Sequence, residues 1–103
     1  MRKYRNKPTM VNGHYFASKK EAAEYTKLMI LEKSGEIQGL TLQPKFPIRI
    51  NDVEVCTYIA DFMYTDPKTN EAVVIDVKGM KTPVYRLKKK LMLAMWGVEI
   101  VEV

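Results

Sequence analysis

The sequence has a single cysteine, Cys56, and a single histidine, His14, among 103 residues. One cysteine cannot form a disulfide within the chain, and it excludes a zinc site built from several thiolates. A lone histidine in a turn-rich segment disfavours histidine acid–base chemistry and a cysteine–histidine nucleophile. Any catalytic chemistry must therefore come from other side chains.

Long apolar runs are also absent. No apolar stretch approaches the roughly 20 residues that a membrane-spanning helix requires, and no repeat or low-complexity segment occurs. The basic start, Met1-Arg2-Lys3-Tyr4-Arg5, has no apolar segment after it, so we expect no secretory signal. With 47% hydrophobic residues, the chain has apolar material for one modest core. We expect a single cytoplasmic domain over residues 1–103 that does not bind membranes, with residues 1–10 as a basic N-terminal arm.

Charge is not scarce. The formal net charge is +5 and the isoelectric point is near 9.3. A basic balance favours an anionic partner, and nucleic acid is the commonest one for a small basic domain.

Turn and cap residues divide the chain into elements. Asn12-Gly13 predicts a tight turn, and Ser18-Lys19-Lys20-Glu21 fits a capping box that opens a helix running to about Lys33. Thr82-Pro83 opens a second helix that Gly97 closes. The expected strands are residues 40–50 (interrupted by Pro44 and Pro47), 53–65, 72–78 and 98–103. The order predicts an α/β (α+β) fold with an αβββαβ core, in which a central mixed four-stranded sheet is flanked by helices.

Two acids interrupt apolar runs. Asp76 stands in Val-Ile-Asp-Val-Lys-Gly, and Asp61 stands fifteen positions earlier in Tyr-Ile-Ala-Asp-Phe. A buried carboxylate without a partner costs several kcal/mol, roughly, so these acids need a reason to be there. Side chains alternate along a strand, so Asp76 and Lys78 should emerge on the same side.

A third acid, Glu21, lies about 50° from the centre of the apolar stripe of the first helix at 100° per residue. Each residue has an ordinary structural explanation. Glu21 fits as the acid of the capping box, Asp61 as a carboxylate held by backbone donors or a lysine, and Asp76 with Lys78 as a salt bridge. Taken together, three inward acids and a lysine favour a metal site. Asp61 and Asp76 would hold Mg²⁺ or Mn²⁺ through oxygens, with Glu21 bound directly or through water. Lys78 would stabilise developing negative charge.

Glu21 at a helix start, Asp61 after Tyr58-Ile59-Ala60, and Asp76-Val77-Lys78 together resemble the PD-(D/E)xK nuclease superfamily. The chain is similar in particular to phage Holliday junction resolvases of the endonuclease I kind, and to a family of small phage and prophage proteins. Ala60 stands where the superfamily has proline, a position that shapes the backbone and binds no metal. The resemblance implies a Mg²⁺-dependent endodeoxyribonuclease with Glu21, Asp61, Asp76 and Lys78 as catalytic residues. It also implies that the Val77 carbonyl touches the metal, and that the protein cuts branched DNA in phage replication or recombination inside a bacterial host.

Basic residues mark the expected DNA contacts. On the second helix, the apolar positions Val84, Leu87, Leu91, Ala94 and Met95 form the stripe that we expect to be buried, which leaves the basic positions facing solvent. An ordinary solvated face is the alternative. The expected DNA-binding residues are Lys19, Lys20, Lys81, Arg86, Lys89, Lys90, Arg2, Lys3 and Arg5.

One active site cuts one phosphodiester, so cutting two strands calls for a two-fold homodimer. The basic arm would then reach across the partner or along DNA. Two alternatives remain open. The first is a nickase or restriction-like nuclease acting on other DNA, and the second is a non-catalytic DNA-binding or assembly protein with a nuclease-like fold.

Overall fold

The computed structural model describes residues 9–77 and 81–103 as a mixed α+β fold. Its helices are α1 (Lys19–Lys33) and α2 (Pro83–Trp96). Its strands are β1 (Thr9–Val11), β2 (His14–Phe16), β3 (Gln38–Leu42), β4 (Lys45–Ile50), β5 (Val53–Ile59), β6 (Phe62–Asp66), β7 (Glu71–Asp76) and β8 (Ile100–Glu102). Thr9 and Met10, which we expected in the N-terminal arm, instead lie in β1.

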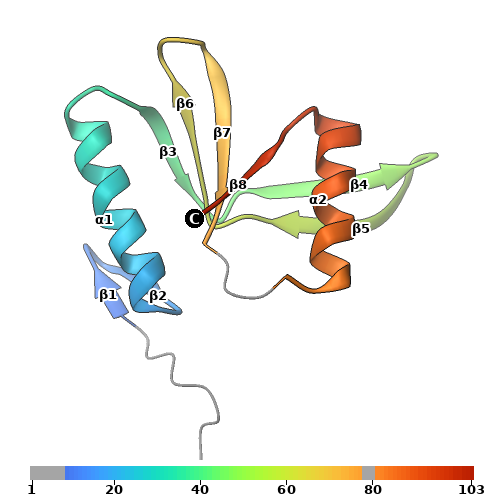
Figure 1. Ribbon diagram of the computed structural model, residues 1–103, viewed down its shortest axis with the longest axis horizontal. Helices are drawn as coiled ribbons and strands as arrows, with labels where there is room; N and C mark the ends of the chain where they lie inside the picture. The colour runs from blue at the N-terminus through green and yellow to red at the C-terminus, as the bar shows by residue number, and fades with distance from the viewer. Residues whose placement is uncertain (1–8, 78–80) are drawn as a thin grey trace, which may run out of the picture.

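A four-stranded sheet forms the centre, with the strand order β3-β6-β7-β8. Strand β8 runs parallel to β7, and the other neighbours are antiparallel, so the predicted mixed four-stranded sheet is confirmed. The sheet lies between α1 and α2 (Figure 1). Two antiparallel hairpins, β1–β2 and β4–β5, form separate two-stranded sheets.

Local capping chemistry sets the helix ends where the sequence predicts them. The Ser18 hydroxyl accepts the Glu21 N–H at 3.1 Å at the start of α1, and the Thr82 hydroxyl accepts the Tyr85 N–H at 3.1 Å at the start of α2. Gly97 ends α2 in the left-handed region with φ of 66°, a conformation that glycine adopts without strain. Pro83 occupies the first helical position, as expected.

The expected strand over residues 40–50 is interrupted near Pro44, as predicted, but it continues through Pro47 in β4. The single long strand that we expected over residues 53–65 is wrong, because it is divided into β5 and β6. The first breaks at Gln43-Pro44, where Gln43 has φ of 51°, and the second breaks at Ala60-Asp61. The Gln43 N–H donates to the Asp61 carbonyl at 2.9 Å, and the Ala60 N–H donates to the Pro44 carbonyl at 3.2 Å. The two breaks therefore lie side by side, and the chain passes there from the central sheet into the β4–β5 hairpin and back.

The break also divides the apolar residues between two cores. Tyr58 and Ala60, before the break, pack in a cluster with Met92 of α2. Phe62, after the break, packs in a second cluster with Tyr25 and Leu28 of α1. Tyr58, Ala60 and Phe62 alternate along the sequence as if on one face of a strand, but they pack in two different hydrophobic clusters.

The face of α2 that we expected to be buried is exposed instead. Val84, Leu87, Ala94 and Met95 are exposed and Leu91 is partly buried, whereas the buried residues of α2 are Tyr85 and Met92. The β4–β5 hairpin explains the difference, because it packs on α2 from the other side. Trp96 Nε1 donates to the Pro47 carbonyl at 3.2 Å, and Lys88 Nζ donates to the Thr57 carbonyl at 3.3 Å. Neither described helix is long and apolar enough to cross a membrane.

Candidate active site

The β6–β7 hairpin brings Asp61 and Asp76 to one end of the central sheet. Phe62 pairs with Ile75, so the two acids are the next residues beyond the last pair of the ladder. The Asp61 N–H donates to the Ile75 carbonyl at 3.1 Å, and the Asp61 Oδ2 accepts the Val77 N–H at 2.7 Å. The structure therefore places these two predicted site residues together.

Asp76 is the one buried charged residue in the described part of the chain, with 2% of its surface exposed. The buried hydroxyl of Tyr58, from β5, donates to Asp76 Oδ2 at 2.5 Å. Burial raises the pKa of Tyr58, and its hydrogen bond to Asp76 raises it further, so the hydroxyl stays a proton donor. Tyr58 thus holds the carboxylate in one orientation.

Asp61 is perturbed in the way expected of an acid in a cluster of acids. Partial burial raises the pKa of Asp61 to about 7, and the nearby charges of Glu21 and Asp76 contribute to the rise. A hydrogen bond to the Asp76 side chain raises this pKa too, whereas the bond from the Val77 amide lowers it. The electrostatic coupling shows that Glu21, Asp61 and Asp76 share one neighbourhood, which we call the acidic cluster.

Glu21 enters this cluster from the first turn of α1. It lines a cleft of about 130 Å³ together with Asp61, His14 and Gln43. Oxygen ligands of this kind suit Mg²⁺ or Mn²⁺. Over residues 9–77 and 81–103, however, no three His, Cys, Asp or Glu side chains stand close enough to hold a metal ion together. The donor chemistry fits a hard divalent cation, and two acids plus backbone or water oxygens would have to hold it.

Two further predicted residues adjoin the cluster. Val77 follows Asp76 and donates its N–H to Asp61, so a role for its carbonyl in binding metal stays a prediction. Lys78 lies outside the described residues.

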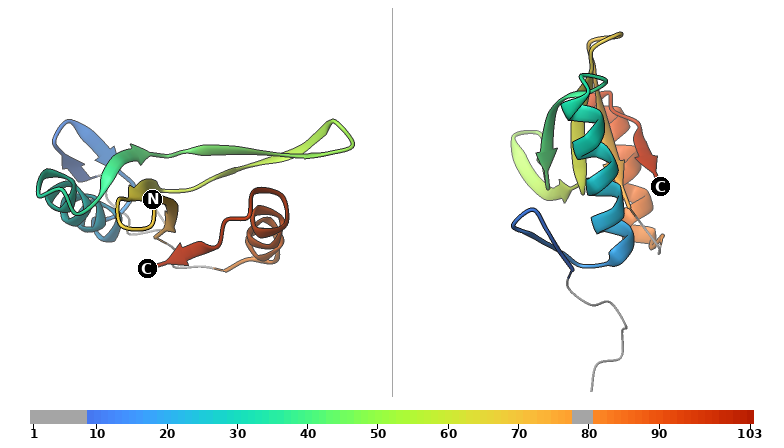
Figure 2. Two further views of the ribbon diagram at one scale, coloured as in Figure 1. Left: turned by 90° about the horizontal axis from the view of Figure 1, so that it is seen from above. Right: turned by 90° about the vertical axis from the view of Figure 1, so that its left-hand side faces the viewer.

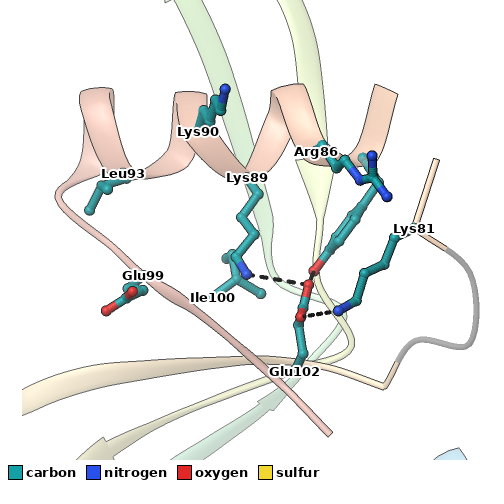
Figure 3. Close-up of a pocket in the computed structure, with 9 residues that line it drawn as sticks. Lys81, Arg86, Lys89, Lys90, Leu93, Glu99, Ile100 and Glu102 are labelled. Atoms are coloured by element: carbon teal, nitrogen blue, oxygen red, sulfur yellow. Dashed lines mark hydrogen bonds and ion pairs between the residues drawn. The ribbon is translucent and has the colours of Figure 1, made fainter. Parts of the chain in front are cut away.

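Four of the predicted DNA-binding residues line one cleft of about 450 Å³ beside α2 and β8 (Figure 3). They are Lys81, Arg86, Lys89 and Lys90. Two of these cations are paired within the protein, because Lys81 Nζ lies 3.0 Å and Lys89 Nζ lies 3.3 Å from the carboxylate of Glu102. A hydrogen bond from Tyr85, reinforced by these lysines, lowers the pKa of Glu102 to about 2.

The remaining basic residues do not share that cleft. Lys19 and Lys20 are exposed on the first turn of α1, on the opposite side of the sheet from α2 (Figure 1). Arg2, Lys3 and Arg5 lie outside the described residues.

One family model matches residues 1–99 and is described as "Protein of unknown function (DUF1064)". The chain belongs to this family. The DUF1064 match spans Glu21, Asp61, Asp76 and Lys78, so the whole predicted site lies within it. No curated protein and no solved structure matches the chain. The functional argument for this DUF1064 protein therefore rests on the chemistry of the site.

Sequence reasoning missed two residues near Asp76, Tyr58 and Lys88. Both line a cleft of about 420 Å³ with Asp76 between the β4–β5 hairpin and α2. A buried tyrosine needs an acceptor for its hydroxyl, so Tyr58 in an apolar stretch could have been predicted to donate to a nearby acid. Lys88 carries no comparable signal, because only the packing of α2 turns it toward this cleft instead of toward solvent.

Proposed function

We propose that this DUF1064 protein is a metal-dependent DNA endonuclease that hydrolyses phosphodiester bonds. The acidic cluster supports this most directly. Three carboxylates from α1 and the β6–β7 hairpin share one neighbourhood, and the pKa of Asp61 rises to about 7. Burial is the largest cause of this rise, and the charges of Glu21 and Asp76 add to it. A bound divalent cation would offset both effects by stabilising the ionised carboxylates.

The roles follow from the position of each group. Asp61 and Asp76 would hold Mg²⁺ or Mn²⁺, with the Val77 carbonyl as a further ligand and Glu21 acting through a bound water. The bound ion supplies neutralisation of the scissile phosphate and a water of lowered pKa. Tyr58 holds the orientation of Asp76 throughout. Lys78 would offset negative charge at the reacting phosphate, and Arg86 and Lys90 would contact neighbouring phosphates.

The element order also supports a restriction-endonuclease-like core. Without the two hairpins, the order is α1, β3, β6, β7, α2, β8, which is the αβββαβ order expected of that core. The β1–β2 and β4–β5 hairpins are additions to it. In this proposal, the mixed sheet positions two acids at the end of β6–β7, and α1 contributes the third.

The substrate is proposed to be branched DNA, as for Holliday junction resolvases of phage replication or recombination. The sequence contains no zinc finger or comparable base-reading module, so we expect recognition of backbone shape. A nickase or a restriction-like nuclease on other DNA is the alternative within the same class.

A non-catalytic DNA-binding protein with the same fold is the second candidate. One observation favours it: no group of three metal-ligating side chains is assembled among the described residues. It predicts binding that needs no divalent ion, falls steeply with salt and leads to no cleavage.

The test is cleavage of a labelled four-way junction with Mg²⁺ and with EDTA by wild type and Asp76→Asn. We expect the variant to lose about 100-fold or more of the cleavage rate while still binding the junction. Glu71→Gln is the matched control, because Glu71 is an exposed acid at the other end of the same strand. Equal cleavage by wild type and Asp76→Asn would overturn the proposal. If wild type cuts the junction and the variant does not, the same assay with flap, duplex and single-stranded substrates measures the substrate specificity.

A further inference from the structure

Helix α2 presents an apolar face that the described chain leaves mostly exposed, with Leu91 as the one member packed against the core. The face is the α2 stripe defined by Val84, Leu87, Leu91, Ala94 and Met95. Val84 is 61% exposed and Leu87 is 57% exposed. The stripe has the spacing of a buried helix face, yet the protein packs on the other side of the helix through Tyr85 and Met92. An apolar helix face left open in this way marks a contact surface.

A second apolar surface lies at the tip of the β4–β5 hairpin, residues 50–55. Ile50, Val53 and Val55 are each at least half exposed, at 50%, 63% and 57%. The hairpin turns through Asn51 and Asp52, which both have positive φ. Its tip projects past α2 in two perpendicular views (Figures 1 and 2). The tip therefore reaches beyond its own helix and cannot cover the stripe of its own chain.

The charges around the two surfaces are opposite. Helix α2 contains four basic residues and no acidic one. At 100° per residue, Lys90 borders one side of the stripe, about 40° from Ala94, whereas Arg86 lies farther round the helix, about 80° from Ala94. The hairpin tip carries the exposed acids Asp52 and Glu54 among its apolar residues, and Glu54 lies 3.8 Å from the exposed Arg49 of the same hairpin. The α2 stripe, which is apolar with basic residues beside it, is thus complementary in charge to the hairpin tip, which is apolar with acidic residues.

We infer that these two surfaces meet across a two-fold dimer of this chain. The hairpin tip of one copy packs on the α2 stripe of its partner, and the same contact recurs in reverse. A two-fold operation uses both surfaces at once, which is the property of an isologous interface. Reciprocal use doubles the contact and helps a small chain approach the roughly 800 Å² per partner of a standard interface. A foreign partner would have to match two surfaces of opposite charge.

This inference does not rest on the proposed nuclease chemistry, although Val84 also lines the cleft that holds Asp76, and Arg86 and Lys90 are also proposed DNA contacts. It uses only packing and charge outside the acidic cluster, and its readouts need neither DNA nor metal. If the protein is dimeric as described but cuts no DNA, the interface stands and only the proposed function fails. If the protein cuts DNA as a monomer, the inferred interface is wrong and the proposed function stands.

The first experiment measures self-association by sedimentation velocity across the micromolar range. We expect wild type to dimerise, and Leu87→Glu to raise the dimer dissociation constant by about 100-fold or more, as for a residue central to an interface. Leu93→Glu is the matched control. Leu93 is 55% exposed on the same helix but outside the stripe, so this variant should dimerise as wild type does. Circular dichroism confirms that both variants are folded. A wild type that is monomeric throughout, or equal effects of the two substitutions, would overturn the inference.

The second experiment identifies which surfaces touch. In a Cys56→Ser background, Val53→Cys and Leu87→Cys chains are prepared separately, mixed and oxidised. We expect a disulfide between the two different chains, because the hairpin tip of one copy lies on the stripe of the other. Cross-linking of Leu87→Cys chains only to one another would instead show helix-to-helix pairing, and would contradict the proposed contact.

Discussion

The two helices of this protein are packed in contrasting ways on the same sheet. Helix α1 buries Ala22, Tyr25 and Leu28 against Phe16 and Phe62, with the rings of Phe16 and Tyr25 5.0 Å apart. Helix α2 buries only Tyr85 and Met92 and turns its apolar stripe outward. An apolar helix face stabilises a protein only where something covers it. The α1 side therefore buries most of its helix face within one chain, although Ile30 is 60% exposed, whereas the α2 stripe is covered by a second copy in the inferred dimer.

Polar contacts also link α2 to its neighbours. The α2 side is joined to its neighbours by single polar bonds, such as Lys88 to Thr57, and by the bonds of Glu102 to Tyr85, Lys81 and Lys89. Such partly exposed bonds contribute little to the free energy of unfolding. The acidic cluster lies where the two sides meet, with Glu21 on α1 and Asp76 held by Tyr58 of the β4–β5 hairpin.

The largest effect that we expect is on the α1 side. Leu28→Ala should lower the free energy of unfolding by about 3 kcal/mol, because Leu28 is 1% exposed and its removal leaves a cavity. Leu87→Ala on α2 should change it by about 0.5 kcal/mol or less at concentrations where the protein is monomeric. Urea unfolding measures both. Equal destabilisation by the two substitutions would contradict the claim that the α2 stripe is less well packed than the buried face of α1.

A smaller effect tests the link between the β4–β5 hairpin and the acidic cluster. Tyr58→Phe removes the hydroxyl that donates to buried Asp76, which should cost about 1–3 kcal/mol of stability. Tyr85→Phe is the matched control. Glu102 keeps its two lysines, so the loss of stability should be much smaller than for Tyr58→Phe. In an active protein, Tyr58→Phe should also raise the Mg²⁺ concentration needed for half-maximal cleavage, with little change in DNA affinity. A Tyr58→Phe protein that matches wild type in stability and in Mg²⁺ requirement would remove the positioning role.

The smallest expected effect is on the pH dependence of stability, and here the substitution should stabilise the protein instead of destabilising it. The pKa of Asp61 is about 7 in the folded protein, whereas an unfolded aspartate titrates near pH 4, roughly. Between these values the native state holds a proton that the unfolded state has released, so stability falls as pH rises through this window. Asp61→Asn removes that loss. At pH above 7 in EDTA the variant should be more stable than wild type by about 1–2 kcal/mol, discounted because Asp61 is partly exposed.

Thermal unfolding from pH 4 to 8 measures this difference. The gap between wild type and Asp61→Asn should close toward pH 4, and Glu71→Gln should follow wild type throughout. A difference that stays constant over the whole range would show that Asp61 does not carry the raised pKa.

Sequence reasoning succeeded where the cause is local. Ser18, Thr82 and Gly97 set helix ends through bonds and angles that involve residues a few positions away. It also found Asp61 and Asp76, because a carboxylate in an apolar run is anomalous whatever the fold. It anticipated an interruption at Pro44 but missed the break at Ala60-Asp61, which is hydrogen-bonded to Gln43 and Pro44 across the chain. It failed again for α2, where the apolar stripe predicts a buried face and the chain alone does not cover it.

The sequence by itself determined the helix ends, the mixed four-stranded sheet and the acids that have no place in an ordinary core. Tertiary structure decided which half of each broken strand joins which sheet, which face of α2 packs inward, and that Lys81 and Lys89 are paired with Glu102. It also decided that Tyr58 holds Asp76. The physical reason is the range of the interactions. Caps and turns are satisfied within a few residues, whereas burial and ion pairing depend on residues that only folding brings together.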